Sequence, residues 1–475
     1  MALTASDSAS YRAALTLPTP MKILPRCAIL LFVALSEPAI AQDSPQPPVP
    51  ARSELAGRRA RLMDSVKTGV ILVRGSETNE DMGLFVQNHE FYYLVGLNEP
   101  NLALLLFPET KEELLFAPAF NPMTARWEGE RVAPGKRGVE ATGIAQVLPE
   151  PQLMERLDKA LAAKSDQRPT LWTPLQPSPG RTSTPGQMAK ALQERQGDPF
   201  DGRLSREQML KAVLEKRFAG VEVKDLTGAI HSLRGIKQKD EIACITRASE
   251  AAAQGIAEAM KSCEPGMFEF EVAAIARYVH DRMGANGDAY GAIVGAGKNG
   301  CVLHYMANMK RIEPTDLIVM DYAPMVANYC ADVTRTFPAS GKFSDEQRKL
   351  VQDLHEIQQQ LVAMVRPGVS MGELESESNR MLSERGYRSV HGMSHHVGLA
   401  VHDVGGHELK PGMVITVEPG AYLDKKAMGC RIEDTVLVTE DGHVNLSAAC
   451  PSSPDAIEKL MAEKGIGQAR IGTKK

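Results

Sequence analysis

The stretch PTDLIVMD, at residues 314–321, has a counterpart in PGMVITVE, at residues 411–418. Each stretch opens with a proline, continues through apolar residues typical of a buried strand, and ends in a carboxylate seven positions after the proline. The two prolines are 97 positions apart. This match indicates an internal repeat in the C-terminal half of the chain.

A second pair of segments supports the repeat. One predicted helix, over residues 240–261, is followed by Glu264-Pro265-Gly266, and another, started by the capping residues Ser344 and Gln347, is followed by Arg366-Pro367-Gly368. A further helix is predicted after each Pro-Gly pair, and these two prolines are 102 positions apart. Two matches in the same order predict duplicated halves that face each other around a shared centre.

Two aspartates flank the turn that follows the first repeated strand. Asp321 ends that strand, Asp332 opens the next one, and Met325 to Asn328 is the natural turn between them. In a symmetric hairpin the two carboxylates lie directly opposite each other, with Cβ atoms ~5 Å apart. Like-charge repulsion makes this placement costly unless a cation lies between them. The pair therefore predicts a bound metal ion.

The second half repeats this arrangement. Glu418 closes its strand, and Glu433 enters the next one ahead of the apolar run Val436-Leu437-Val438 and the turn pair Asp441-Gly442. Any one of these acids alone is more typical of a solvated cap or turn residue. Their joint pattern predicts four carboxylates that converge on one centre.

Residues 391–403, with the sequence HGMSHHVGLAVHD, supply imidazoles on a segment whose glycines disfavour a long helix. One of these histidines can be a neutral nitrogen ligand. His402 falls opposite His304 when the two halves are aligned. We interpret Cys330 as a packing residue. We interpret the following histidines as satisfied core or surface groups: His280, His355, His396, His407 and His443.

Four carboxylates and one imidazole form a mostly hard, oxygen-rich ligand set. Such a set suits two Mn²⁺ ions better than a zinc pair, with cobalt, iron and zinc as alternatives. No CxxC motif is present to indicate a structural zinc. Two ions roughly 3.5–4 Å apart can share a hydroxide, which forms near neutral pH and attacks a carbonyl. The predicted chemistry is metal-assisted hydrolysis.

With these residues in place, the chain resembles the aminopeptidase P and prolidase group of the pita-bread metallopeptidases. The resemblance covers most of the chain after residue 41 and rests on several specific motifs. These are FYYLVGLNEP at 91–100, WEGER at 127–131, NGCVLHY at 299–305, DVTRTFPASGKF at 332–343, HGMSH at 391–395, VHDVG at 401–405, VEPG at 417–420 and RIED at 431–434.

The resemblance implies a fold and a ligand set. The fold is α+β, with a mixed α/β, creatinase-like N-terminal domain followed by a duplicated pita-bread catalytic domain. Creatinase shares the fold but lacks such a ligand set, and methionine aminopeptidase usually lacks the N-terminal domain. The residues that would hold the two metal ions are Asp321, Asp332, His395, Glu418 and Glu433.

The resemblance also implies roles for residues around the ligands. His304 and His402 would position the substrate and steady the charged tetrahedral intermediate. His391 and Arg431 would contact the ligand side chains and hold them in place without binding the metals themselves. Glu418 would carry a proton from the bridging water to the leaving nitrogen.

Two departures from the group's pattern affect the expected substrate pocket. Asp321-Tyr322-Ala323 stands where the group often has Asp-Ala-Gly, and His396 stands where an aromatic or bulky apolar residue is common. Neither change removes a ligand. We expect them to alter peptide-length preference and strictness for proline rather than catalysis.

The N-terminal half has a different pattern. From Ser53 to about Arg203, short apolar runs alternate with Pro/Gly breaks and helical stretches, which is typical of a mixed α/β domain. Residues 204–236 are predicted to form an amphipathic helical bridge into the catalytic domain. We place the N-terminal domain at residues 53–232 and the catalytic domain at residues 233–475.

The first residues have the pattern of an export signal. Two basic residues precede the apolar stretch at 27–35, and Ala39-Ile40-Ala41 gives a small-x-small cleavage site. The stretch is too short to span ~30 Å of hydrocarbon, so we expect no stable membrane anchor. We predict that residues 1–41 are a signal peptide with an upstream extension and that residues 42–52 are a Pro-rich linker. The protein is then exported to the periplasm or secreted.

Composition narrows the range of partners. The 475 residues are 43% hydrophobic, which is enough for more than one core. The net charge of −5, without a long basic run, does not favour nucleic acid or an anionic membrane as partner. The cysteines after residue 41 match no zinc or redox spacing, and a disulfide after export remains open.

The leading hypothesis is an Xaa-Pro aminopeptidase, which hydrolyses the bond between the N-terminal residue of a peptide and a following proline. That bond is a tertiary amide whose nitrogen carries no hydrogen, so ordinary backbone recognition fails. The alternatives are a prolidase acting on Xaa-Pro dipeptides and a metal-free binding protein. We also expect a homo-oligomer.

Overall fold

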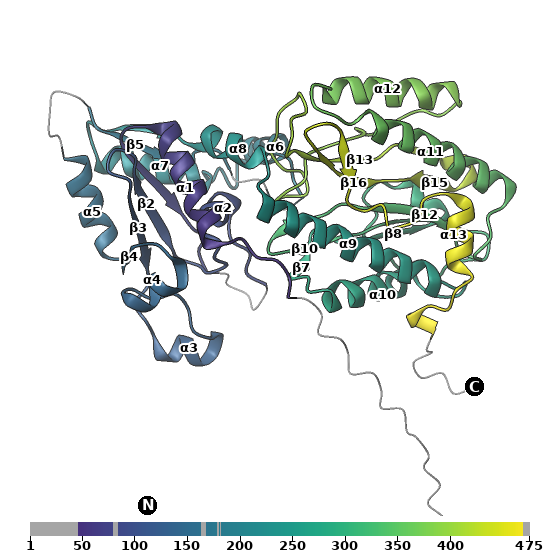
Figure 1. Cartoon of the computed structure of the whole chain (residues 1–475), viewed down its shortest axis with the longest axis horizontal. Coiled ribbons are helices and arrows are strands. Elements are labelled where there is room, and N and C mark those ends of the chain that lie inside the picture. The colour runs from purple at the N-terminus through teal and green to yellow at the C-terminus, as the bar shows by residue number, and fades with distance from the viewer. Residues whose placement is uncertain (1–45, 79–83, 163–167, 178–179, 181, 469–475) are drawn as a thin grey trace, which may run out of the picture. The chain divides into compact units, whose positions relative to one another are not determined.

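The computed structural model describes residues 46–78, 84–162, 168–177, 180 and 182–468 (Figure 1). The predicted signal peptide, residues 1–41, lies outside the described residues. All elements discussed below belong to one compact unit, Gln46–Lys475. Within the described ranges, no helix is both long and apolar enough to cross a membrane.

The N-terminal part is built on a six-stranded sheet with the order β4-β3-β2-β1-β5-β6. Alternate residues of its strands enter two different cores, since Ile71 and Leu104 pack on one face and Leu72 and Leu105 on the other. The strands are β1 (Val70–Arg74), β2 (Ala103–Phe107), β3 (Glu112–Ala117), β4 (Gln146–Pro149), β5 (Thr170–Thr173) and β6 (Glu222–Asp225). The helices are α1 (Arg52–Val66), α2 (His89–Val95), α3 (Pro122–Glu128), α4 (Lys136–Thr142), α5 (Gln152–Leu161), α6 (Pro185–Gly197), α7 (Arg206–Arg217) and α8 (Thr227–Gly235).

The prediction of a helical bridge over residues 204–236 is wrong in its middle. Strand β6 separates α7 from α8 and pairs in parallel with β5, from Thr170↔Glu222 to Thr173↔Asp225. Gly220, at φ +98°, reverses the chain after α7. Pairing with a sheet overrides helix propensity here, because the partner strand lies about fifty residues away in the sequence. The predicted boundary between residues 232 and 233 falls inside α8.

The C-terminal part shows the repeat as two helix pairs around a set of strands. Figure 1 shows α9 and α10 on one side of these strands and α11 and α12 on the other. Ile256, Ile318 and Leu354 are fully buried in the core that these layers share. The elements of the first half are α9 (Lys239–Ser262), α10 (Glu269–Arg282), β7 (Gly287–Asp288), β8 (Ile293–Ala296), β9 (Leu317–Asp321), β10 (Pro324–Val326), β11 (Tyr329–Cys330) and β12 (Thr334–Pro338). Those that follow are α11 (Asp345–Met364), α12 (Met371–Glu384), β13 (Val414–Val417), β14 (Gly420–Leu423), β15 (Met428–Arg431), β16 (Asp434–Val438), β17 (His443–Asn445) and α13 (Pro454–Met461).

The predicted helix starts and ends of the repeat agree closely with the structure. Helix α9 extends one residue beyond the predicted 240–261 at each end. Helix α11 begins after Ser344, whose hydroxyl accepts from the Gln347 N–H while the Gln347 side chain accepts from the Ser344 N–H. This reciprocal cap is the one that the sequence predicted.

The first hairpin has a register two residues away from the symmetric one that we predicted. Asp321 pairs with Thr334, and the turn is the two-residue Ala327-Asn328, with φ values of +48° and +64°. Two central residues at positive φ form the tight turn that matches strand twist. The prediction that Asp321 and Asp332 lie directly opposite is therefore wrong. A shift of two positions nevertheless keeps both side chains on one face of the hairpin.

Candidate metal centre

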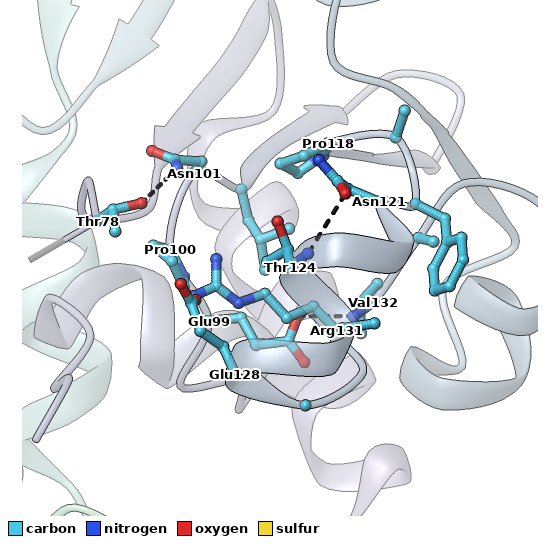
Figure 2. Close-up of a pocket in the computed structure, with 16 residues that line it drawn as sticks. Thr78, Glu99, Pro100, Asn101, Pro118, Asn121, Thr124, Glu128, Arg131 and Val132 are labelled. Atoms are coloured by element: carbon cyan, nitrogen blue, oxygen red, sulfur yellow. Dashed lines mark hydrogen bonds and ion pairs between the residues drawn. The ribbon is translucent and has the colours of Figure 1, made fainter. Parts of the chain in front are cut away.

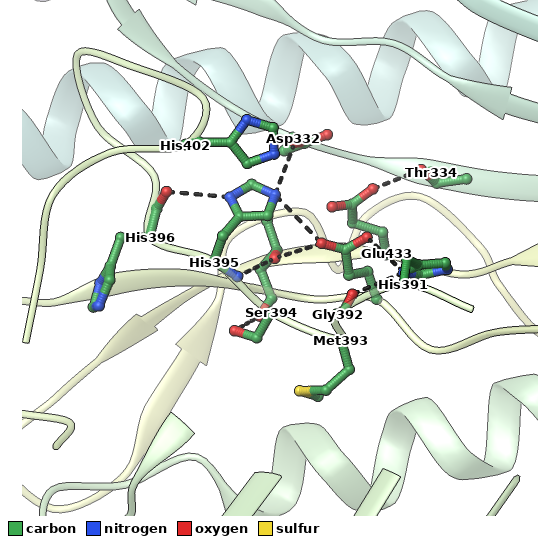
Figure 3. A network of polar contacts seen from close by, with 12 residues as sticks. Asp332, Thr334, His391, Gly392, Met393, Ser394, His395, His396, His402 and Glu433 are labelled. Atoms are coloured by element: carbon green, nitrogen blue, oxygen red, sulfur yellow. Dashed lines mark hydrogen bonds and ion pairs between the residues drawn. The ribbon is translucent and has the colours of Figure 1, made fainter. Parts of the chain in front are cut away.

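Three of the predicted ligands, Asp332, His395 and Glu433, come together between segments of the two halves (Figure 3). Asp332, His395 and Glu433 each offer a ligand atom, and these atoms lie within 4.8 Å of one another. The Nε2 atom of His395 is 3.5 Å from Asp332 Oδ2 and 3.3 Å from Glu418 Oε1. Asp321 joins this group through a shared hydroxyl partner, described below. The structure thus gathers all five predicted metal ligands.

Burying so many carboxylates together is electrostatically unfavourable. Burial raises the pKa of Glu433 well above its usual range, and the charges of Asp332 and Glu418 raise it further. Burial also raises the pKa of Glu418 to about 7. A divalent cation removes this cost by pairing with the ionised carboxylates. The chemistry of the donor set therefore fits a pair of divalent metal ions.

His395 is oriented to present Nε2 to the carboxylates. Its Nδ1 is 3.2 Å from the carbonyl oxygen of His396, to which it donates. Burial lowers the pKa of the imidazole, but the hydrogen bond to Asp332 and the charges of Glu418 and Asp332 outweigh burial and raise it to about 9. The carboxylates therefore attract positive charge to this position, as a cation site requires.

Two hydroxyl donors of the site were not predicted. The Tyr290 hydroxyl lies 2.6 Å from Oδ1 of both Asp321 and Asp332. The Thr334 hydroxyl donates to Glu433 Oε2 at 2.6 Å. Tyr290 belongs to the segment between β7 and β8, so no local pattern connects it with the aspartates. Thr334 follows Asp332 by two positions, and strand alternation would have placed it on the same face.

The predicted supporting residues both contact this centre. Arg431 Nη2 donates to Asp321 Oδ2 at 2.6 Å, and its Nε is 3.2 Å from the Thr334 hydroxyl. His391 Nδ1 is 3.7 Å from Glu418 Oε2. The Tyr422 hydroxyl lies between these two supports, 2.9 Å from Arg431 Nη1 and 3.0 Å from His391 Nε2.

The two predicted substrate histidines differ in position. The ring of His402 lies 4.2 Å from that of His395, centroid to centroid, and its Nδ1 is 2.5 Å from the carbonyl oxygen of Thr182. His304 is exposed on the segment after the short helix η1 (Gly297–Cys301). Burial lowers the pKa of His402 and of His391, and the charge of His304 contributes to both shifts. His304 is therefore within electrostatic range of both rings.

Tyr322 and His396, the two departures from the group's pattern, do not contact the carboxylates of the metal centre. The Tyr322 hydroxyl donates to Asp288 Oδ1 at 2.6 Å, and its ring packs on His280. His396 is buried, and its Nε2 is 2.9 Å from the carbonyl oxygen of Gly406. Figure 3 shows the His396 ring turned away from His395. The interpretation of His396 as a satisfied core group is wrong in part, because its Nδ1 is buried with no hydrogen-bond partner among the described residues. It is also wrong for His280, whose two ring nitrogens are both buried without such a partner.

The cysteines of the described residues form no disulfide with one another, and none belongs to the candidate metal cluster. Cys330 is buried, with Sγ 3.8 Å from the carbonyl oxygen of Leu399. The cysteines that form no disulfide are Cys244, Cys263, Cys301, Cys330, Cys430 and Cys450.

A separate cavity of about 330 Å³ lies in the N-terminal part (Figure 2). Glu99 and Arg131, from two of the N-terminal motifs, line it. Glu99 accepts the N–H of Val132, the residue that follows the second motif, at 2.7 Å. None of the residues that line the cavity is a predicted metal ligand.

Comparison with known proteins identifies the family. Residues 243–440 match metallopeptidase family M24, and residues 55–171 match the aminopeptidase P N-terminal domain. The chain is 30% identical over 459 residues to the Xaa-Pro aminopeptidase of Escherichia coli strain K12, covering 86% of this chain and 98% of that protein. The chain belongs to the Xaa-Pro aminopeptidase group of metallopeptidase family M24.

Other members of the family match as well. The Xaa-Pro dipeptidase of Pyrococcus furiosus is 37% identical over 234 residues, which cover 48% of this chain and 67% of that protein. The solved structure of zinc-substituted E. coli aminopeptidase P in complex with product has a TM-score of 0.73 and 28% identity, covering 87% of this chain and 99% of that chain. The predicted fold class and the predicted class of enzyme, a metallo-exopeptidase, are confirmed.

Proposed function

We propose that this M24 metallopeptidase removes the N-terminal residue from peptides whose second residue is proline. The observation that carries the proposal is the convergence of four carboxylates and the His395 imidazole in a fold shared with aminopeptidase P. Similarity over nearly the whole length of proteins named Xaa-Pro aminopeptidase supports an aminopeptidase rather than a dipeptidase. Similarity to a protein named Xaa-Pro dipeptidase, over about half of this chain, supports the prolidase alternative.

Two divalent metal ions would bind at this centre. The oxygen-rich donor set favours Mn²⁺, with Co²⁺, Fe²⁺ and Zn²⁺ as alternatives. When bound, the metal pair supplies an activated water as the nucleophile near neutral pH. The residues that would hold the ions are Asp321, Asp332, His395, Glu418 and Glu433.

The side chains of the protein then have separate tasks. Glu418 accepts a proton from the attacking water and delivers it to the prolyl nitrogen, which has no hydrogen of its own and leaves as a secondary amine. His402 and His304 hold the substrate and stabilise the charge that develops on its carbonyl oxygen. Arg431 and His391 keep the carboxylates Asp321 and Glu418 in place.

The deciding experiment compares peptides of different length. The Mn²⁺-loaded protein should cleave tripeptides and longer chains with proline at the second position, and it should leave matched peptides with alanine there intact. A chelator should abolish this activity, and Mn²⁺ should restore it better than Zn²⁺. Cleavage of dipeptides alone would favour prolidase. Full activity without metal would refute the mechanism, and inactivity with every metal would favour a binding protein.

We also propose that the protein is exported and forms a homo-oligomer. The cleavage pattern ending at Ala41 supports export, and sequencing of the exported protein should begin at or near Gln42. Recovery of residues 22–41 on exported protein would contradict this. Exposed apolar side chains near α3, with Met123 at 62% and Trp127 at 80% exposure, support self-association. Light scattering that finds only monomers would contradict it.

A further inference from the structure

A second buried cluster of charges lies beside the metal centre and is not explained by it. Arg234 Nη1 is 2.8 Å from Glu90 Oε1, and its Nη2 is 2.5 Å from Asp403 Oδ1. Lys237 Nζ is 3.4 Å from the other Asp403 oxygen. The side chains of these four residues are at most 5% exposed. Two cations and two anions are thus withdrawn from water, which is costly unless each charge is closely paired.

The cluster is connected to the metal centre through the backbone. Asp403 directly follows His402, and its N–H donates to the carbonyl oxygen of His396 at 2.8 Å. The same carbonyl accepts from Nδ1 of His395. Whatever fixes Asp403 therefore fixes both the position of His402 and the acceptor that orients His395.

The loop at residues 395–403 packs closely around the Asp403 carboxylate. A Cβ atom on Gly398 would lie 1.9 Å from Asp403 Oδ2, which only a glycine at that position avoids. A Cβ atom on Gly405 would lie 2.3 Å from the His396 ring. With so little free space, movement of the carboxylate must move the loop at residues 395–403.

We infer that Arg234 is a positioning residue for the reaction: by holding Asp403 it keeps His395 and His402 in the geometry that metal binding and turnover need. The inference rests on the proposed function. The competing explanation is that Arg234 only balances the buried charges of Glu90 and Asp403, so that its loss would affect folding and nothing else.

Two variants separate these explanations. Arg234→Met removes the contact and leaves the cluster with one excess negative charge. Glu90→Gln/Arg234→Met removes the contact but restores the balance, because Asp403 still faces Lys237. We expect both variants to lower kcat and to weaken Mn²⁺ binding to metal-free protein, each by about tenfold or more. The double variant should recover most of the thermal midpoint that the single variant loses.

Arg58→Met is the matched control. Arg58 is also fully buried and pairs with Asp240 at 2.6 Å, which links α1 to α9. Its other hydrogen bonds go to the Tyr93 carbonyl and the Tyr329 hydroxyl, which lie outside the loop at residues 395–403. Its loss should lower the thermal midpoint while kcat and the Kd for Mn²⁺ change by less than about twofold. Calorimetric titration of Mn²⁺, steady-state kinetics and thermal melts measure the three quantities for each variant.

Recovery of both kcat and Mn²⁺ affinity in the double variant would overturn the inference, because charge balance alone would then suffice. Equal losses in Arg58→Met would overturn it too, since any buried arginine would then have the same effect. If Arg234→Met does not fold, the balanced double variant still gives the answer. A wild-type protein that cleaves no Xaa-Pro peptide would refute the proposed function, while the Mn²⁺ titrations would still test the role of Arg234.

Discussion

The two halves of the catalytic part place their carboxylates differently on similar hairpins. In the second half, the β13–β16 and β14–β15 pairs share one register, and Glu418 and Glu433 lie between these two pairs. The two glutamates are therefore directly opposite each other. In the first half, Asp321 is opposite Thr334, and Asp332 is two positions away. The direct opposition that the sequence predicted for the aspartates therefore occurs in the glutamate pair.

The difference is compensated by donors that cross from one half to the other. Arg431, from the second half, donates to Asp321 of the first. Thr334, from the first half, donates to Glu433 of the second, and the backbones of these two residues are also hydrogen bonded. Tyr290 serves the aspartates from within the first half, but Arg431 and Thr334 reach across to the acids of the other half. The site therefore exists only when the two halves pack together.

The largest effect should separate Glu418 from His402. Glu418→Gln removes a ligand and the proton carrier together, so we expect loss of metal and a fall in kcat of about 10³-fold or more. His402→Ala removes only a contact with the reacting peptide, so both metals should remain while kcat falls by about 10²–10³-fold. Metal content by mass spectrometry, measured with kinetics, checks both variants.

The opposite outcome would reverse these roles. If His402→Ala emptied the metal centre, or if Glu418→Gln kept near-normal turnover, the alignment that sets His304 opposite His402 would need to be redrawn.

A smaller effect tests the donor that links the halves. Thr334→Val keeps the shape of the side chain but removes the hydroxyl that donates to Glu433. We expect metal affinity to fall by about tenfold, because the carboxylate loses the partner that orients it. Thr334→Ser, which retains the hydroxyl, should keep most of the affinity. Equal affinity in the valine and wild-type proteins, measured by Mn²⁺ titration, would show that the link between halves is not needed.

The smallest effect is on the stability of metal-free protein. Burial raises the pKa of Glu418 from 4.5 to about 7, so the folded state binds the extra proton and stability falls as pH rises through this window. For His395, burial is outweighed by Asp332 and Glu418, and the pKa rises from 6.5 to about 9, so its contribution is present below the lower value and lost through the higher one. The two shifts act in the same direction.

With chelator present, the thermal midpoint should therefore fall between about pH 5 and about pH 9. Glu418→Gln, which cannot ionise, should flatten the part below about pH 7. Asp332 in the first half has a lowered pKa despite burial, because His395 hydrogen bonds to it, and its contribution is lost only in acid. A thermal midpoint that rises with pH across the neutral range would contradict the raised pKa values of Glu418 and His395.

The sequence by itself determined the repeat, the helix ends and the candidate ligands. The capping pair Ser344 and Gln347 acts within one turn, and the position of a carboxylate at a strand end follows from apolar patterning, so both are local properties. The motifs that carry the family resemblance are likewise contiguous. This is why the fold class and the class of enzyme were predictable from the chain alone.

Only the tertiary structure decided which partners these residues meet. The turn at Ala327-Asn328 fixed the register of the first hairpin, and β6 formed because β5 offered it an edge to pair with. Tyr290 reaches Asp321 across 31 positions of sequence, and Arg234 reaches Asp403 across 169. Such contacts depend on how elements pack in space, and no periodicity within either segment records them.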